Sequence, residues 1–167
     1  MTVAFYMAGA VAILSTCLVI TRLNAVHALL YLIVSLLSVA LVFYSLGAPF
    51  IAALEVIVYA GAIMVLFVFV VMMLNLGSAA TEQERRWLRP GMWIGPAILS
   101  AILLAQLIYV CSVGPPHESG QTVIGPKQAG IALFGPYLVG VELASMLLLA
   151  GLVGAYHLGR RGEMERK

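Results

Sequence analysis

Five long apolar stretches, joined by short polar connections, dominate this 167-residue sequence. Each stretch approaches or exceeds the roughly 20 residues that an α-helix needs to cross the hydrocarbon core of a bilayer. Hydrophobic residues make up 63% of the chain and charged residues 10%, against about 45–50% and about 25% in soluble domains. A soluble fold of this length could not bury so much apolar surface. We therefore predict an all-α integral membrane protein with five transmembrane helices, at about residues 2–20, 26–46, 51–76, 92–113 and 131–158.

The connections between these stretches are too short to fold by themselves. The longest are residues 77–91 and 114–130, and neither approaches the size of an independent domain. We expect the Gly- and Pro-rich 114–130 loop to be irregular. Residues 1–160 are predicted to form a single five-helix transmembrane domain, followed by a short tail over 161–167. This organisation leaves no room for a soluble catalytic or nucleotide-binding domain.

The distribution of Lys and Arg predicts how the helices are oriented. Eight of the nine basic residues fall on one side of the membrane, in the connections after the first and third stretches and in the tail, whereas Lys127 alone falls on the other. Basic residues concentrate on the cytoplasmic side of membrane proteins. The N-terminus is therefore predicted to be periplasmic and the C-terminus cytoplasmic.

The third stretch contains a carboxylate, Glu55, and a glycine, Gly61, between Ala60 and Ala62. An ionisable group inside a membrane is costly, so it usually faces a partner or a water-filled path. With no charged neighbour in the sequence, a buried Glu55 is expected to be protonated. It shares a helix face with Tyr59, four residues later. Glycine among β-branched residues is a point where a helix can change its hydrogen-bond register.

Two interpretations of these residues stay open from their spacing alone. Glu55 contacts protons or water on a helix that changes register, or it is a neutral hydrogen-bonding group that never titrates. The glycine likewise marks either a mobile turn or a tight helix crossing, because glycine is frequent in membrane helices.

The fifth stretch carries a second carboxylate, Glu142, for which Ser145 offers a local partner. Small residues surround it and favour a packing role, although a proton-pathway role is the alternative. Small residues four apart let helix backbones approach closely. We expect a helix-packing surface that includes Gly140, Ala144, Gly151 and Gly154.

Metal and cofactor sites find little support in the sequence. A bis-histidine haem between His27 and His157 is geometrically conceivable, but histidines at helix ends more often reach toward water. No paired-cysteine ligand motif, serine-nucleophile motif or glycine-rich phosphate loop is present in the sequence. We expect no metal and no cofactor on this chain.

Four segments of the chain closely resemble the subunit J family of bacterial respiratory complex I, the counterpart of mitochondrially encoded NADH dehydrogenase subunit 6. They are NAVHALLYLIVSLL (24–37), ALEVIVYAGAIMVLFVFVVMMLN (53–75), WIGPAILSAI (93–102) and LFGPYLVGVELASMLLLAGLVGAYHLGR (133–160). The resemblance extends in the same order and spacing through Arg160, except over the 114–130 loop.

The resemblance implies a membrane subunit between the quinone-binding part of the complex and its antiporter-like subunits, in the bacterial inner membrane. It implies a π-bulge around Tyr59 to Gly61, whose conversion to regular helix opens or closes a hydrated path. Glu55 would belong to a chain of buried charges that links quinone reduction to proton pumping. NADH, flavin, iron–sulfur clusters and quinone would be bound by partner subunits.

Two other functions remain as alternatives. The chain could be a purely structural assembly subunit of the same complex, held to its neighbours by the small residues of the fifth stretch. It could also be a subunit of a related multisubunit cation/proton antiporter or membrane hydrogenase.

Overall fold

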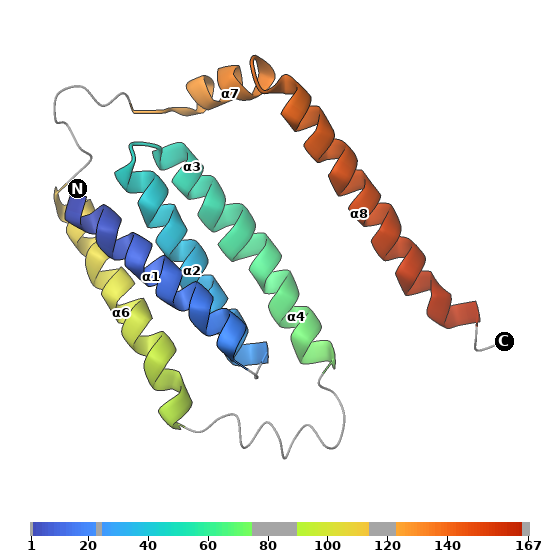
Figure 1. The fold of residues 1–167 in the computed structure, drawn as a ribbon, viewed down its shortest axis with the longest axis horizontal. Coiled ribbons are helices and arrows are strands. Elements are labelled where there is room, and N and C mark those ends of the chain that lie inside the picture. Colours follow the sequence, from blue (N-terminus) through green and yellow to red (C-terminus); the bar gives the residue numbers. More distant parts are fainter. Residues whose placement is uncertain (1, 23–24, 75–89, 114–122, 165–167) are drawn as a thin grey trace. The chain divides into compact units, whose positions relative to one another are not determined.

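The computed structural model describes residues 2–22, 25–74, 90–113 and 123–164 of the chain. These residues are helical apart from short turns and connections, which confirms the predicted all-α class (Figure 1). Five helices are long and apolar enough to cross a membrane: Thr2–Thr21, Ala25–Ser45, Pro49–Met73, Trp93–Ser112 and Leu138–Gly159. In a bilayer the helix is favoured because it satisfies its backbone hydrogen bonds within one segment.

The chain divides into two compact units, Met1–Ile124 and Gly125–Lys167, which we describe separately. The single five-helix domain expected over 1–160 stays a prediction. The first unit holds α1 (Thr2–Thr21), α2 (Ala25–Ser45), a composite third spanning helix, and α6 (Pro90–Val113). The third helix is continuous through α3 (Pro49–Leu54), η1 (Glu55–Ile63) and α4 (Met64–Leu74).

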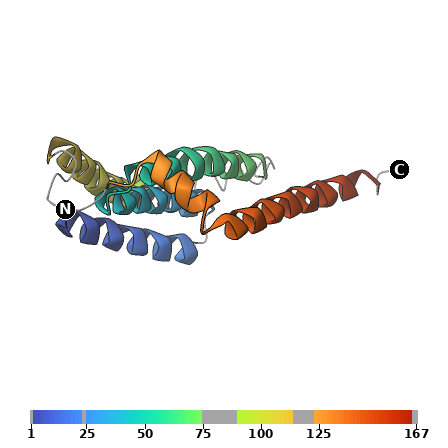
Figure 2. The same cartoon turned by 90° about the horizontal axis from the view of Figure 1, so that it is seen from above.

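Helix α2 is the centre of the first unit and contacts each of its other helices. The core lies where α1, α2 and α6 meet, around Val11, Val34 and Leu103. Figure 2 shows the same helices from above, with α1 and α6 on different sides of α2. The composite third helix packs mainly on α2.

The turn between α2 and α3 fixes where the third helix begins. Gly47 has a positive φ of 81°, and the N–H of Ala48 donates to the Phe43 carbonyl at 3.0 Å. This pattern is a Schellman motif, in which glycine takes the left-handed conformation without a Cβ penalty. Pro49 then occupies the first turn of α3, where its missing N–H costs nothing. The N–H of Ile124 also donates to the Gly47 carbonyl, at 2.9 Å.

The second unit differs from the helix expected over 131–158. A short helix, α7 (Pro126–Phe134), is followed by a break at residues 135–137 and then by α8 (Leu138–Met164). Pro136 ends α7 because proline lacks an N–H and its ring clashes with the preceding turn. A Cβ at Gly135 would lie 2.7 Å from the Ile131 carbonyl oxygen, so this close approach needs glycine. Part of the expected irregular 114–130 loop, residues 126–130, is thus helical.

Candidate functional site

The third spanning helix changes its hydrogen-bond register in the middle of the membrane-spanning stretch. At Glu55 the backbone N–H donates to Ile51 and Ala52, as in an α-helix or its tighter variant. Residues Glu55–Ile63 are π-helical. At the end of this segment the N–H of Met64 reaches the Tyr59 carbonyl, five residues earlier. The structure therefore contains a π segment longer than the bulge that the family resemblance implied.

The sequence of this segment explains why an α-helix is not strongly preferred here. Val56, Ile57, Val58 and Ile63 are β-branched, which restricts χ1 in a helix. Gly61 has lower helix propensity than any of them. π-helical turns are rare and occur often at functional sites. The lowest helix propensity in the segment lies at Gly61, where the residue pattern left open a mobile turn or a tight crossing and the family resemblance implied a π-bulge.

The packing around Gly61 depends on the π geometry. A Cβ at this position would lie 3.1 Å from the Val56 carbonyl oxygen, five residues earlier. That contact is tighter than a side chain normally makes, and the carbonyl belongs to the helix backbone. The absence of a side chain at Gly61 therefore favours the observed register.

Side chains anchor the helix on both sides of the π segment but not within it. Ala52 in α3 is 7% exposed and Met64, the first residue of α4, is 1% exposed. No residue of η1 itself is buried. Two packed ends thus enclose a segment that this chain leaves open to lipid or to another protein.

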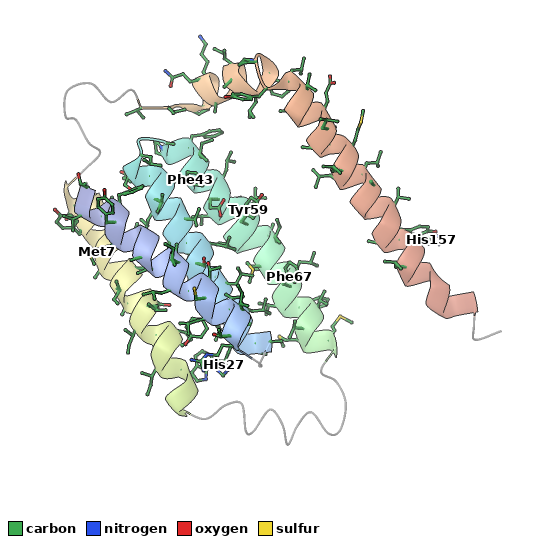
Figure 3. All side chains as sticks on the ribbon, viewed as in Figure 1. Met7, His27, Phe43, Tyr59, Phe67 and His157 are labelled. Atoms are coloured by element: carbon green, nitrogen blue, oxygen red, sulfur yellow. The ribbon has the colours of Figure 1, made fainter. Side chains whose placement is uncertain are left out.

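The predicted site residues occupy this open segment. Glu55 is intermediate in exposure, and among the described residues no hydrogen bond or ion pair to its carboxyl group is found. Tyr59, labelled in Figure 3, follows one turn later and is 51% exposed. Ala60 is intermediate and Ala62 exposed. The described part of this chain therefore supplies no polar partner for the carboxyl group.

A cavity of about 470 Å³ lies beside the start of the π segment, between α2, α3, η1 and α6. Val56 is the η1 residue in its wall, facing Tyr44 of α2 and Ser100 of α6. The remaining lining is apolar, and Glu55 does not contribute to it. The cavity thus lies beside the π segment, and the carboxyl group of Glu55 is not part of its wall.

Glu142 lies in the second unit, on the exposed helix α8. Its expected partner, Ser145, instead donates its hydroxyl to the backbone carbonyl of Glu142, at 2.7 Å. The expected Ser145–carboxylate contact was therefore wrong: a serine in a helix readily bonds to the carbonyl one turn back.

The expected packing residues of α8 are all exposed in this unit. No heavy atom outside the local helix backbone lies within 4 Å of a Cβ built at Gly140, Gly151 or Gly154. A groove on this helix is formed by Met146, Leu149, Ala150, Val153, Gly154 and His157. The small residues remain a predicted packing surface, open in this chain.

Hydroxyl and amide groups between helices are contacts that the sequence reasoning did not assign. Thr16 and Ser35 join α1 to α2 through their hydroxyls, at 2.8 Å. The Gln106 amide of α6 donates to the Ala4 carbonyl of α1. A polar residue inside an apolar stretch indicates that a hydrogen bond is needed there. The sequence does not identify the partner, because the partner depends on which helices are neighbours.

Among the described residues, no group of three His, Cys, Asp or Glu side chains is arranged to hold a metal ion. His27 is buried in the first turn of α2, and His157 is exposed on α8 in the other unit. Both are labelled in Figure 3.

Comparison with known proteins agrees with these features. The model of the family NADH-ubiquinone/plastoquinone oxidoreductase chain 6 matches residues 15–158. NADH-quinone oxidoreductase subunit J of Pseudomonas aeruginosa is 62% identical over 162 residues, covering 96% of this chain and 98% of that protein. The Escherichia coli K12 subunit J is 64% identical over 161 residues, covering 96% and 87% of the two chains. A Buchnera aphidicola subunit J is 50% identical over 160 residues, covering 96% and 98%.

The matched region includes the π segment, the second, third and fourth spanning helices, the last residues of α1 from Ser15 on, and the fifth spanning helix up to residue 158. The helices and the bacterial relatives together indicate a multi-pass protein of the inner membrane. The chain belongs to the NADH-ubiquinone/plastoquinone oxidoreductase chain 6 family and is a membrane subunit of NADH-quinone oxidoreductase, respiratory complex I.

Proposed function

We propose that this subunit couples quinone reduction to proton translocation through a change of helix register in Glu55–Ile63. The observation that carries the proposal is the π segment that begins at the membrane carboxyl group of Glu55. A π segment contains about one residue more than an α-helix with the same number of turns. If it converts to α-helix, the part of the helix beyond it turns by roughly 100°, the angle per residue of an α-helix. Such a turn re-aims side chains between a closed and a hydrated arrangement.

The packing supports movement of the α4 end. The α3 end is fixed by the Schellman turn at Gly47 and by Pro49. In α4, Val65, Leu66 and Phe67 are each more than half exposed, so rotation there disturbs few contacts within this chain. Met64 is the exception, because it is fully buried. Its side chain has to leave or repack its site for the register to change.

In this proposal Glu55 supplies the proton-linked group. Its carboxyl group takes part in a chain of buried charges with residues of neighbouring subunits, and Tyr59 lies beside it on the same helix. Whether it is ionised or neutral then depends on whether the register places it in water or in lipid, because a carboxylate is stable only where it is solvated or paired. A second role in the same pathway is proposed for Glu142.

The redox chemistry is assigned to partner subunits. Flavin, iron–sulfur clusters and quinone would be bound there, since the spanning helices take up most of this chain and its connections are too short to form a separate domain. We place the subunit between the quinone-site subunit and the antiporter-like subunits. The Lys and Arg distribution supports a periplasmic N-terminus and a cytoplasmic tail.

The test is a Gly61→Val substitution in the complete enzyme, compared with Gly9→Val. A Cβ at Gly61 meets the Val56 carbonyl oxygen at 3.1 Å, whereas a Cβ at Gly9 meets nothing within 4 Å. Gly61→Val should lower quinone-linked NADH oxidation and proton uptake into inverted vesicles, with assembly retained. Gly9→Val should leave both rates near the parent values. Full proton pumping in an assembled Gly61→Val enzyme contradicts the register mechanism.

A purely structural role is the second candidate, and the unpacked small-residue side of α8 favours it. In that case Gly61→Val would be tolerated, whereas Gly140→Leu or Gly154→Leu would dissociate the complex. Measuring assembly and pumping on the same preparations separates the two functions.

A further inference from the structure

Arg22, at the end of α1, is a cation held against an aromatic ring. Its guanidinium carbon lies 5.7 Å from the centroid of the Tyr31 ring in α2, within the range of a cation–π interaction. Arg22 is exposed, and among the described residues none makes a hydrogen bond or ion pair with it. Arginine has five N–H donors in a planar fork. The contact with the ring makes no hydrogen bond, so these donors are available to an acceptor.

Tyr31 is a rigid support for this guanidinium. It is 3% exposed and packs against Gly95 of α6, where a Cβ would overlap the tyrosine hydroxyl and lie 3.2 Å from Cζ. The ring therefore has little freedom to turn. Arg22 is positioned by the contact between three helices, α1, α2 and α6.

No carboxylate in the described part of the first unit neutralises this charge. Glu55 is the acidic residue among the described residues of that unit, and it directly follows the six-residue α3. Arg22 precedes α2, which has 21 residues, and Glu55 comes six residues after the start of the returning third helix. The helical rise therefore places Arg22 and Glu55 on the order of 20 Å apart along the membrane normal.

The surroundings of Arg22 combine this charge with apolar surface. Ile20 is 79% exposed and Val26 is 39% exposed, on either side of Arg22 in the chain. The position is the end of a spanning helix, where lipid headgroups meet hydrocarbon. A ligand that suits it has a negatively charged head with acceptor oxygens and an apolar tail.

We propose that Arg22, held over the Tyr31 ring, binds the phosphate group of a phospholipid whose acyl chain lies along Ile20. Arginine matches phosphate through two parallel charge-assisted hydrogen bonds. Basic sites between transmembrane helices on the cytoplasmic side are suited to anionic lipid heads. A protein carboxylate would satisfy the guanidinium but would leave the apolar surface beside it uncovered, so the lipid accounts for more of the site.

The experiment uses the complete enzyme with photoreactive benzoylphenylalanine in place of Ile20. After detergent purification and illumination, mass spectrometry of this subunit should show an adduct with the mass of one phospholipid. Arg22→Gln should lower the adduct yield by about tenfold, as expected when a charge-assisted hydrogen bond is lost. Arg22→Lys should retain part of it, because the charge remains but the planar fork is lost.

Lys127→Gln is the matched control, because it removes an exposed cation from the second unit and should leave the yield unchanged. An equal lipid adduct in the Arg22→Gln enzyme overturns the proposal. A cross-link from position 20 to another subunit in place of lipid shows that a protein group covers Arg22, and also overturns it. So does inorganic phosphate recovered from the denatured enzyme with no lipid adduct, which assigns the site to free phosphate.

Discussion

Gly61 and the carbonyl group of Val56 approach each other so closely that a Cβ on Gly61 would lie 3.1 Å from that oxygen. The two residues are five apart, the spacing of a π-helical hydrogen bond. A methyl group added there would strain the π register. In a regular α-helix the same change is favourable, since alanine exceeds glycine in helix propensity by about 1 kcal/mol.

We therefore expect Gly61→Ala to shift the register of residues 55–63 toward α-helix by at least about fivefold, the ratio that corresponds to 1 kcal/mol. Hydrogen exchange of peptides from this segment, measured in the complete enzyme, checks the shift: amide protection should rise there. Gly9→Ala is the control, because it adds the same methyl group in open space on α1. Unchanged exchange in residues 55–63 of the Gly61→Ala enzyme contradicts this prediction.

Glu55→Gln tests whether titration of the membrane carboxyl group matters. Glutamine keeps the size and the hydrogen-bonding capacity of glutamic acid but cannot release a proton. We expect fewer protons translocated per NADH oxidised in inverted vesicles, with electron transfer to a soluble artificial acceptor unchanged. The comparison is Glu142→Gln, at the exposed carboxylate of α8, for which we expect a smaller loss. An unchanged proton ratio in Glu55→Gln would show that the carboxyl group is a hydrogen-bonding spacer.

Gly95→Ala should weaken the contact between α2 and α6, because the added Cβ would overlap the Tyr31 hydroxyl and lie 3.2 Å from Cζ. Overpacking of this kind costs about 1–3 kcal/mol. Less assembled subunit in the membrane and a lower thermal inactivation temperature are the expected readouts. Tyr31→Phe removes the overlapping hydroxyl, so the double variant should recover much of the loss. A double variant as unstable as Gly95→Ala places the strain elsewhere.

Gly151→Leu should reduce assembly of the complex, because it fills the small-residue side of α8. At 100° per residue, Gly140, Ala144, Gly151 and Gly154 lie on one side of this helix, and small residues there allow close helix approach. Gly159→Leu is a matched substitution on another side of α8, also in open space within this chain. Native gel electrophoresis of detergent-solubilised membranes should show loss of the intact complex for Gly151→Leu alone. If both variants assemble equally well, the small residues of α8 do not form a packing surface in the complex.

Much of the candidate site was within reach of the sequence. Glu55 and Gly61 were noticeable because charge and glycine are costly inside an apolar helix. The π register itself came from the family resemblance. The residue pattern alone allowed a mobile turn or a tight crossing, because local propensity barely separates the two helix types at a β-branched, glycine-containing segment. The break of the fifth stretch into α7 and α8 falls at Gly135 and Pro136, residue types that are unfavourable inside a helix, whereas the helical start at Pro126 was not predicted.

The sequence by itself determined the fold class and the number of spanning helices, because a helix in a bilayer satisfies its own backbone hydrogen bonds and is visible as an apolar stretch of sufficient length. Tertiary structure decided what lies between the helices: the Thr16–Ser35 bond, the Gln106–Ala4 bond, and the support that Tyr31 gives to Arg22. These contacts join residues far apart in the chain. They depend on which helix faces meet, and that is set by packing of side-chain shapes across helices, which local sequence does not encode.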